Sequence, residues 1–239
     1  MGRAFEFRKE RKFKRWAKMA VQFTRLGKEI AMAVKAGGGN PETNSRLRTA
    51  IQNAKGVNMP KDRIESAIKR ASSRDEKDYE EIVYEGYGPY GVAILIETAT
   101  ENINRTVGNI RSYFSKHDGS LGKTGSLDFI FTRKSIFKIR DQNFDADELE
   151  LELIDFGLEE LYIENEGEIS IQCAFEDFGL MQKVLEEKNC DIISAKPERI
   201  AQSHVAVTEA QAEEILKLLD RFEEDDDVQA VYHNMAEKR

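Results

Sequence analysis

Apolar residues near the N-terminus recur with the period of an α-helix. Intervals of three and four residues separate them and place them along one face: Trp16, Met19, Phe23, Leu26, Ile30 and Ala33. Gly37, Gly38 and Gly39 predict the end of this helix, because glycine adopts the left-handed conformation after a helix without steric cost. We therefore predict one long amphipathic helix, with Trp16 as a core anchor rather than a platform for stacked bases.

Two shorter helices are predicted after the glycines. Asn40 or Asn44 can cap a second helix that ends near Gly56, and Pro60 suits the first turn of a third. The apolar faces are Leu47, Ala50, Ile51 and Ala54 in the second helix and Ile64, Ala67, Ile68 and Ala71 in the third. Three such helices bury their apolar faces against one another, so residues 1–75 are predicted to form a bundle. The polar stretch SSRDEKDYEE, residues 72–81, is interpreted as the linker that follows.

Beyond the linker the pattern changes to that of a mixed α/β protein. It predicts a strand over 92–97, a helix capped by Thr100, and a strand LDFIF over 127–131. That helix is expected to bury Ile103, Val107, Ile110 and Phe114. Near the C-terminus we expect a strand over 203–207, a helix opened by a capping box of Thr208 and Gln211, and a strand over 227–234. Strand–helix–strand, repeated once, is the split βαβ arrangement of ferredoxin-like folds.

The region between these two halves has the same pattern of elements. It contains IFKI, a helix around 149–154, a hairpin LYIENEGEISI, a helix around 178–185 and the strand-like CDIISA. The predicted fold class is therefore α+β: an N-terminal three-helix bundle followed by two α/β domains of ferredoxin-like type, one inserted in the other. The predicted domains are residues 1–75, residues 80–133 plus 202–239, and an inserted acidic α/β domain of residues 134–201.

The net charge of −8 conceals a strong segregation of charge along the chain. Residues 1–74 carry 19 Lys and Arg against 6 Asp and Glu, whereas the remainder carries 17 against 38. From Asp141 to Gln182 there are 14 acidic residues and no Lys or Arg. A basic end on an acidic body predicts a protein that binds a polyanion through one part, although a solvated helix face would give the same run of charge.

Basic side chains that avoid the apolar faces are the candidate phosphate contacts. The densest run is FRKERKFKRW, residues 7–16, where aromatic rings between the cations could stack on unpaired bases. The candidates are Arg8, Lys9, Arg11, Lys12, Lys14, Arg15 and Lys18, then Arg46, Arg48 and Lys55, then Arg63, Lys69 and Arg70. The predicted partner is nucleic acid, DNA or RNA or both, and the pattern does not separate the two.

The stretch GSLGKTGS, residues 119–126, contains the GKT letters of a nucleotide-binding P-loop. A P-loop requires a glycine five positions earlier, where this chain has His117. A P-loop also follows a strand and opens a helix, and here the predicted order is the reverse. We interpret the stretch as a glycine-rich turn from a helix to a strand.

Catalytic and metal-binding patterns are weak in this sequence. His117, His204 and His233 lie in separate segments without metal-ligand spacing, and neither GxSxG nor HExxH occurs. His233 is the best catalytic candidate, but a surface or packing role is favoured for it. We predict a protein that is not an enzyme and that holds no cofactor or metal.

Location and assembly follow from composition alone. No run of about 18 apolar residues exists, and the N-terminus has no apolar segment of the secretory kind. Cys173 and Cys190 lack CxxC spacing and are interpreted as reduced thiols. We expect a cytoplasmic, monomeric protein without a membrane partner.

Several longer stretches resemble the YebC family of bacterial and organellar proteins. They are AGGGNPETNSRLRTAIQNAKGVNMPKD, YEEIVYEGYGPYGVAILIET, NRTVGNIRSYFSKHDGSLGKTGS and DDVQAVYHN, and they run in order across nearly the whole chain. YEGYGP with the downstream GxxGxTGS is the most specific part. The residues that match the motif loops are Tyr84, Gly86, Tyr87, Gly88 and Pro89, then Asn104 and Arg105, then Gly122, Lys123, Gly125 and Ser126.

The resemblance implies three domains, a helical N-terminal bundle and two α/β domains around a groove. It also implies a probable DNA-binding transcriptional regulator. The alternative comes from relatives, including a mitochondrial translational activator, that act on the ribosome, where some relieve stalls at proline-rich stretches. A further alternative is a protein-interaction module that contacts the ribosome or the transcription machinery through its acidic α/β domains.

Some letters depart from the family pattern. The chain begins GRAFEFRKERKFKRW where members usually have a GHSKW-like stretch. Contacts that family members make through the residues of that stretch are therefore not expected in this chain. Pro89-Tyr90-Gly91 stands where many members have PGG, and Asn102-Ile103-Asn104-Arg105-Thr106 where many have NRNRT. By resemblance, GSLGKTGS is a shaped loop on an α/β domain with Lys123 at its tip, facing RNA or protein.

Overall fold

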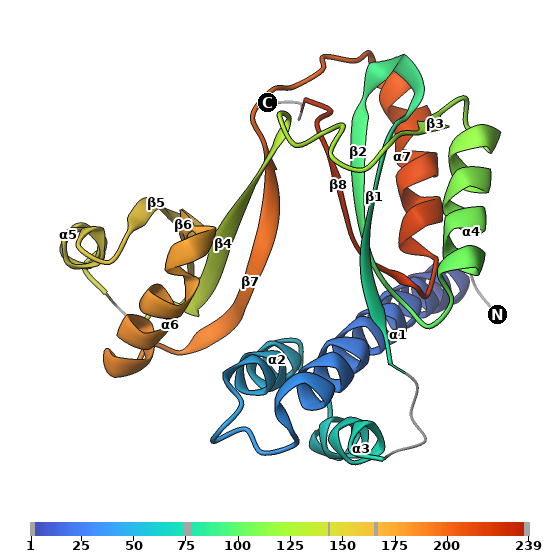
Figure 1. Ribbon diagram of the computed structural model, residues 1–239. Helices are drawn as coiled ribbons and strands as arrows, with labels where there is room; N and C mark the ends of the chain where they lie inside the picture. The colour runs from blue at the N-terminus through green and yellow to red at the C-terminus, as the bar shows by residue number, and fades with distance from the viewer. Residues whose placement is uncertain (1–2, 74–77, 143, 165–166, 237–239) are drawn as a thin grey trace.

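The structure is a computed structural model that describes residues 3–73, 78–142, 144–164 and 167–236, with side chains from residue 19 onward. Within these residues the chain forms N-terminal helices followed by two four-stranded antiparallel sheets with helices packed on them (Figure 1). The predicted α+β class is confirmed. None of the helices described is long and apolar enough to cross a membrane.

The N-terminal helices are α1 (Arg3–Gly37), α2 (Ser45–Gly56) and α3 (Lys61–Ala71). Gly38, with a φ of 84°, follows the end of α1 as the sequence predicted. Asn44 caps α2 by accepting the N–H of Leu47, and its amide group donates to the carbonyl of Ala33 at 2.7 Å. The apolar faces meet in one cluster that includes Leu26, Ile30, Leu47, Ala50, Ile64 and Ala67. The side chain of Trp16 lies outside the described residues.

The first sheet has the strand order β3-β1-β2-β8. Its elements are β1 (Glu80–Tyr87), β2 (Ala93–Thr100), α4 (Ile103–Lys116), β3 (Ser120–Leu121), α7 (Glu209–Glu223) and β8 (Val228–His233). A 3-10 turn, η1 (Pro89–Gly91), joins β1 to β2. Helices α4 and α7 cover one face and bury Phe114 and Phe222 against the isoleucines of β2 (Figure 1). Leu127, Ile130 and Phe131 cover the other face.

Four local predictions for this part of the chain were wrong, and one strand was missed. LDFIF is not a strand, since residues 124–130 form turns and only Phe131 belongs to β4. Residues 203–207 form only an isolated bridge between Val205 and Met235, and strand β1 was missed. Asn102 caps α4 in place of Thr100, which ends β2, and Ile103 is 39% exposed rather than buried. At the two mispredicted strands, tertiary packing overrode a short local pattern, whereas the cap at Asn102 is a local contact with the N–H of Arg105.

The second sheet has the order β5-β6-β4-β7, which is that of a ferredoxin-like split βαβ fold. Its elements are β4 (Phe131–Arg140), α5 (Ala146–Ile154), β5 (Leu158–Glu164), β6 (Glu168–Ala174), the 3-10 turn η2 (Phe175–Asp177), α6 (Phe178–Glu187) and β7 (Ile192–Ala201). Its core contains Phe137, Leu153, Ile171 and Leu185. The helices and the hairpin predicted for this region are confirmed.

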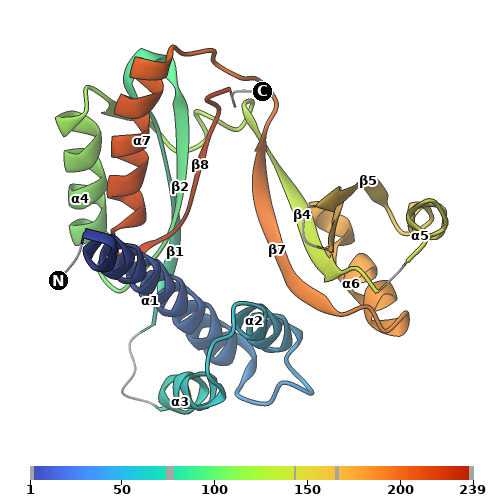
Figure 2. The same ribbon diagram turned by 180° about the vertical axis from the view of Figure 1, so that it is seen from behind.

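The two sheets stand side by side, and the helical bundle lies across one end of both (Figures 1 and 2). Helix α1 runs below the first sheet, while α2 packs against β7 of the second. The exact limits proposed for the three domains stay a prediction.

Candidate nucleic-acid interface

The predicted basic residues fall into groups with different surroundings. The N-terminal group belongs to α1, and its side chains lie outside the described residues. Its members are Arg8, Lys9, Arg11, Lys12, Lys14, Arg15 and Lys18. On α2, Arg46 pairs with Glu81 at 2.8 Å and Arg48 lies 3.9 Å from Glu186. Both acids belong to the α/β body, so these two arginines already contribute charge to contacts within the molecule.

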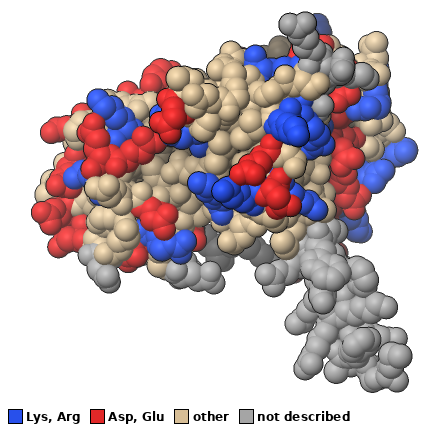
Figure 3. Space-filling model, turned by 90° about the horizontal axis from the view of Figure 1, so that it is seen from below, with Lys and Arg blue, Asp and Glu red and all other residues tan. Residues whose placement is uncertain are grey.

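The remaining candidates, Lys55, Arg63, Lys69 and Arg70, have exposed side chains on α2 and α3. Figure 3 shows the bundle side of the molecule, where Lys and Arg stand in separate groups with Asp and Glu between them. Arg63 and Arg70 are seven residues apart and share one flank of α3, while Lys69 projects from another flank. Within the described residues the basic surface is therefore discontinuous.

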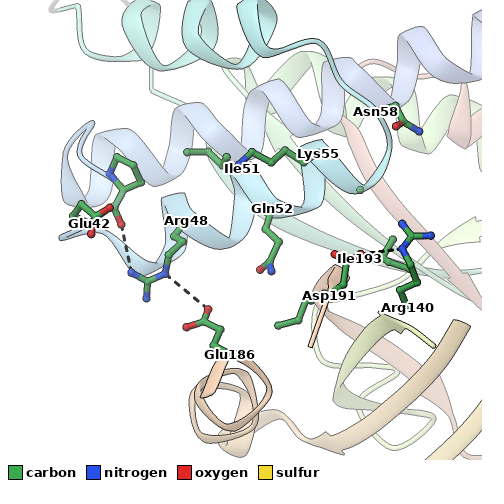
Figure 4. A pocket seen from close by; sticks show the side chains of 13 residues that line it. Glu42, Arg48, Ile51, Gln52, Lys55, Asn58, Arg140, Glu186, Asp191 and Ile193 are labelled. Carbon is green, nitrogen blue, oxygen red and sulfur yellow. Dashed lines mark hydrogen bonds and ion pairs between the residues drawn. The ribbon is translucent and has the colours of Figure 1, made fainter. Parts of the chain in front are cut away.

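A cavity of about 540 Å³ lies between α2 and the second sheet (Figure 4). Three basic side chains line it, those of Arg48, Lys55 and Arg140, and so do three acidic ones, those of Glu42, Glu186 and Asp191. Arg140 pairs with Asp191 at 2.9 Å, and Arg48 faces Glu186. Because its lining is balanced in charge, this cavity has no net attraction for a polyanion.

The contact between α2 and β7 is built from hydrogen bonds between a side chain of α2 and the backbone of β7, and from a close approach of the two elements. The Asn53 amide donates to the Ala195 carbonyl at 2.9 Å and its oxygen accepts the Ala195 N–H at 2.8 Å. Nearby, the Thr49 hydroxyl and the buried Gln182 amide group are hydrogen-bonded. A β-carbon at Gly56 would lie 1.9 Å from the Ile193 carbonyl oxygen, so the helix approaches the strand only because residue 56 is glycine.

The contact between α1 and the first sheet centres on a buried ion pair. Lys28 donates to Asp227 at 3.1 Å and to the carbonyls of Ala99 and Asp226 at 2.9 and 2.7 Å. Asp227 also accepts hydrogen bonds from Thr106 at 2.8 Å and Arg105 at 2.6 Å. Burial by itself would raise the pKa of Asp227, but the hydrogen bonds from Arg105, Thr106 and Lys28 outweigh it and hold the pKa below its ordinary value.

The matched YEGYGP and GxxGxTGS stretches come together around another buried acid, Glu85. Its carboxylate accepts the N–H of Gly125 at 2.8 Å, the N–H of Leu127 at 2.7 Å and the Ser126 hydroxyl at 3.3 Å. Its backbone carbonyl accepts the N–H of Gly122 at 2.7 Å. The loop is therefore wrapped around a carboxylate of its own domain, which is a structural use of N–H groups that a P-loop would point at phosphate.

The glycines of these stretches allow two segments to touch. A β-carbon at Gly86 would lie 2.5 Å from the Ser120 carbonyl oxygen, and one at Gly119 would lie 2.8 Å from the Tyr87 carbonyl oxygen. Gly88 is buried and Pro89 opens η1. These glycines thus have a packing role, whatever the loop binds.

Other motif side chains differ in their access to solvent. Tyr84 is buried, Tyr87 is 36% exposed and Lys123 is exposed. Asn104 is exposed at the start of α4, next to Arg105 of the Asp227 network and away from the glycine loop. Tyr90, where many family members have glycine, has a φ of 62° and donates its hydroxyl to Glu214.

Neither cysteine has the environment of a reactive thiol. Both are free and buried, and burial raises the pKa of Cys173 to about 11 and raises that of Cys190. Thiols with raised pKa values stay protonated near neutral pH and are poor nucleophiles.

Sequence reasoning missed Lys28, Glu85, Asp227 and Phe129. Lys28 and Asp227 meet across 199 positions, so no local pattern could indicate the pair. Glu85 is the one charged residue within IVYEGY, residues 82–87, and this is the signal by which the sequence could have indicated it. Phe129 was placed in a strand, yet its side chain is 76% exposed on the turn that follows the glycine loop.

Comparisons with known proteins cover nearly all of this architecture. A family model described as the TACO1/YebC protein N-terminal domain matches residues 3–74. A second, described as the TACO1/YebC second and third domain, matches residues 79–235. The boundary between the two matches lies in the connection from α3 to β1.

Relatives from two bacteria are similar over their full length. A protein of Cytophaga hutchinsonii is 63% identical over 237 residues, with 99% of each chain covered. One of Flavobacterium johnsoniae is 57% identical over 238 residues, with 100% of each covered. Both are named probable transcriptional regulatory protein. The crystal structure of a conserved hypothetical protein from Aquifex aeolicus matches with a TM-score of 0.79 at 36% identity, over 92% of this chain and 90% of that one.

Proposed function

The chain belongs to the TACO1/YebC family, and on this premise we propose that it is a nucleic-acid-binding regulator of gene expression that acts without catalysing a reaction. The first candidate activity is regulation of transcription through DNA, in line with the names of the bacterial relatives. The candidate interface is the basic N-terminal bundle, and the acidic α/β body is the candidate surface for protein partners.

The observation that carries this proposal is the segregation of charge between bundle and body. Residues 1–74 hold 19 basic and 6 acidic residues, while the rest of the chain is strongly acidic. Cationic side chains neutralise phosphates and release counterions, which supplies affinity for any nucleic acid. The acidic remainder repels the same polymer, so binding is directed to the bundle.

A second candidate is a ribosome-associated translation factor that binds ribosomal RNA. The observation that favours it is a pair of aromatic rings, Phe23 and Tyr79, beside Arg63 and Arg70 on the bundle. Rings next to cations suit unpaired bases, which structured RNA presents in loops and bulges and a DNA duplex does not.

The salt dependence of binding tests the proposal. Each phosphate contact contributes about 0.7–0.9 to the steepness of the plot of log affinity against log salt. Changing Arg11, Lys12, Lys14 and Arg15 to Gln removes four such contacts and should reduce that slope by about three. Titrations against duplex DNA and structured RNA at several salt concentrations measure it. An unaltered slope on both polymers would remove the N-terminal run from the binding site.

A control variant removes basic residues from the acidic body. Arg111, Lys116 and Lys217 are exposed on α4 and α7, and changing them to Gln should leave the slope unaltered. Crosslinking in cells then separates the candidates: enriched promoter fragments support transcription, and enriched ribosomal RNA supports translation. A protein complex that survives nuclease treatment, with neither polymer enriched, would instead indicate a protein-interaction module.

A further inference from the structure

A second concave site lies on the bundle, between α1 and α3. It encloses about 380 Å³, within the range of about 300–1,000 Å³ typical of small-ligand sites. The side chains that matter here are Phe23 and Lys28 on α1, Arg63, Ser66 and Arg70 on α3, and Tyr79 just before β1. Among the described residues that line this groove, none is Asp or Glu, in contrast to the cavity beside α2.

Two arginines form one wall of the groove. Arg63 and Arg70 are two helical turns apart on the same flank of α3, whereas Lys61 and Lys69 project from other flanks. The Arg63 guanidinium lies 5.6 Å from the centre of the Phe23 ring. A planar guanidinium can stack on a ring and still donate to phosphate oxygens, which an ammonium group cannot do equally well.

Two aromatic rings form the rest of the surface. Phe23 and Tyr79 are half-buried and pack against the bundle core, which fixes the position of both rings. The part of each side chain that is not buried in the core lines the groove. The Lys28 ammonium lies 5.2 Å from the Tyr79 ring, but its hydrogen bonds go to Asp227 and two carbonyls. Lys28 therefore holds Tyr79 in place, while Arg63 and Arg70 form no ion pair with any of the described residues and supply the positive charge of the groove.

We propose that this groove binds one unpaired nucleotide of a single strand, with its base against Phe23 or Tyr79 and its phosphate held by Arg63 and Arg70. The proposal rests on the proposed nucleic-acid function and names the form of nucleic acid that the bundle recognises. A duplex keeps its bases stacked inside and its phosphates outside, so it can meet the arginines but not the rings. A single strand can meet both, and base–ring stacking is tolerant of sequence.

The test compares two double variants of α3 that lose the same charge. Arg63→Gln with Arg70→Gln alters the groove, and Lys61→Gln with Lys69→Gln alters the other flanks of the same helix. The probes are labelled oligoadenylate, as RNA and as DNA, and the matching duplexes. Both variants should lose a similar factor on duplex, but the groove variant should lose about tenfold more than its control on the single strand, equivalent to about 1.4 kcal/mol.

A second pair of variants tests the ring itself. Tyr79→Leu should weaken single-strand binding about 5- to 150-fold, since stacking on a ring is worth about 1–3 kcal/mol per base. It should also abolish the quenching of a fluorescent adenine analogue in the strand. Tyr79→Phe keeps the ring and should retain both properties, which separates stacking from a general loss of fold. Loss of binding in Tyr79→Phe equal to that in Tyr79→Leu would overturn the stacking proposal.

The outcomes distinguish the groove from the function on which it rests. If the two double variants behave alike on single strands while the protein still binds nucleic acid, the groove proposal is overturned and the proposed function stands. If the unaltered protein binds none of the probes, both fail. If the groove variant loses binding of a glutamate-rich peptide and not of single strands, an acidic protein segment is the occupant and the proposal is overturned.

Discussion

Replacing Asp227 by Asn should destabilise the protein far more than its single lost charge suggests. Asp227 is 4% exposed, and its carboxylate faces Lys28, itself 9% exposed, at 3.1 Å. An asparagine keeps the shape and one acceptor oxygen but leaves the Lys28 ammonium buried without a counter-charge. Removing one partner of a buried pair costs about 3–5 kcal/mol, because the other charge stays desolvated.

The other partners of Asp227 add less to this loss. The hydroxyls of Thr100 and Thr106 are buried, and each hydrogen bond of this kind contributes about 0.5–1.5 kcal/mol. The Arg105 side chain is 55% exposed, so solvent screens its ion pair and its share is at most about 1 kcal/mol. Because the substituted asparagine would retain part of these contacts, the buried pair with Lys28 dominates the expected loss of about 3–5 kcal/mol.

Urea unfolding followed by far-UV circular dichroism at neutral pH measures the loss. With a denaturant dependence of about 1–3 kcal/mol per molar, the midpoint should fall by about 1 M or more. Asp226→Asn is the matched control, since its side chain is exposed and only its backbone carbonyl meets Lys28. Surface changes of this kind stay within about 0.5 kcal/mol. Equal small effects in both variants would refute the assignment of Asp227 as the centre of the α1 contact.

The pH dependence gives an independent check on the same pair. The pKa of Asp227 lies below its ordinary value of 3.8, so its charged form stabilises the fold. The advantage of the unaltered protein over Asp227→Asn should be complete above pH 3.8 and decline as the pH falls through the lower pKa of the folded state. A difference that instead grows as the pH falls would contradict the direction of the shift.

Three further predictions concern other parts of the molecule. Gly56→Ala should cost about 1–3 kcal/mol in urea unfolding, because its β-carbon would lie 1.9 Å from a carbonyl oxygen of β7, and an unchanged midpoint would contradict that contact. Glu85→Ala should speed trypsin cleavage after Lys123, because the loop loses the acceptors of its N–H groups; an unchanged cleavage rate would show that the carboxylate does not hold the loop. Burial raises the pKa of Glu29, which disfavours its charged form, so Glu29→Gln should raise the urea midpoint at neutral pH. This gain should shrink as the pH falls below the raised pKa and vanish below the ordinary value of 4.5, and an unchanged midpoint at neutral pH would contradict the shift.

Local periodicity was enough to define the helices and most of the inserted domain. The apolar face of α1 from Phe23 to Ala33, the cap at Asn44 and the Thr208–Gln211 capping box depend on neighbours within one or two helical turns, and these predictions are confirmed. The segregation of charge is also a property of the sequence alone. The helix faces and caps need only residues that are close along the chain, and the charge segregation needs only counting.

Tertiary structure decided the features whose partners are distant in sequence. Residues 127–131 read as a strand, but the open face of the first sheet buries Leu127, Ile130 and Phe131 at helical spacing and turns Phe129 outward. The spacing of residues 119–126 already argued against a P-loop, but only the tertiary structure brought Glu85, 40 positions before Gly125, to accept the N–H groups of this turn. The groove beside α3 and the pairing of Arg46 and Arg48 with the body likewise depend on how α1, α2 and the sheets pack, which no local pattern encodes.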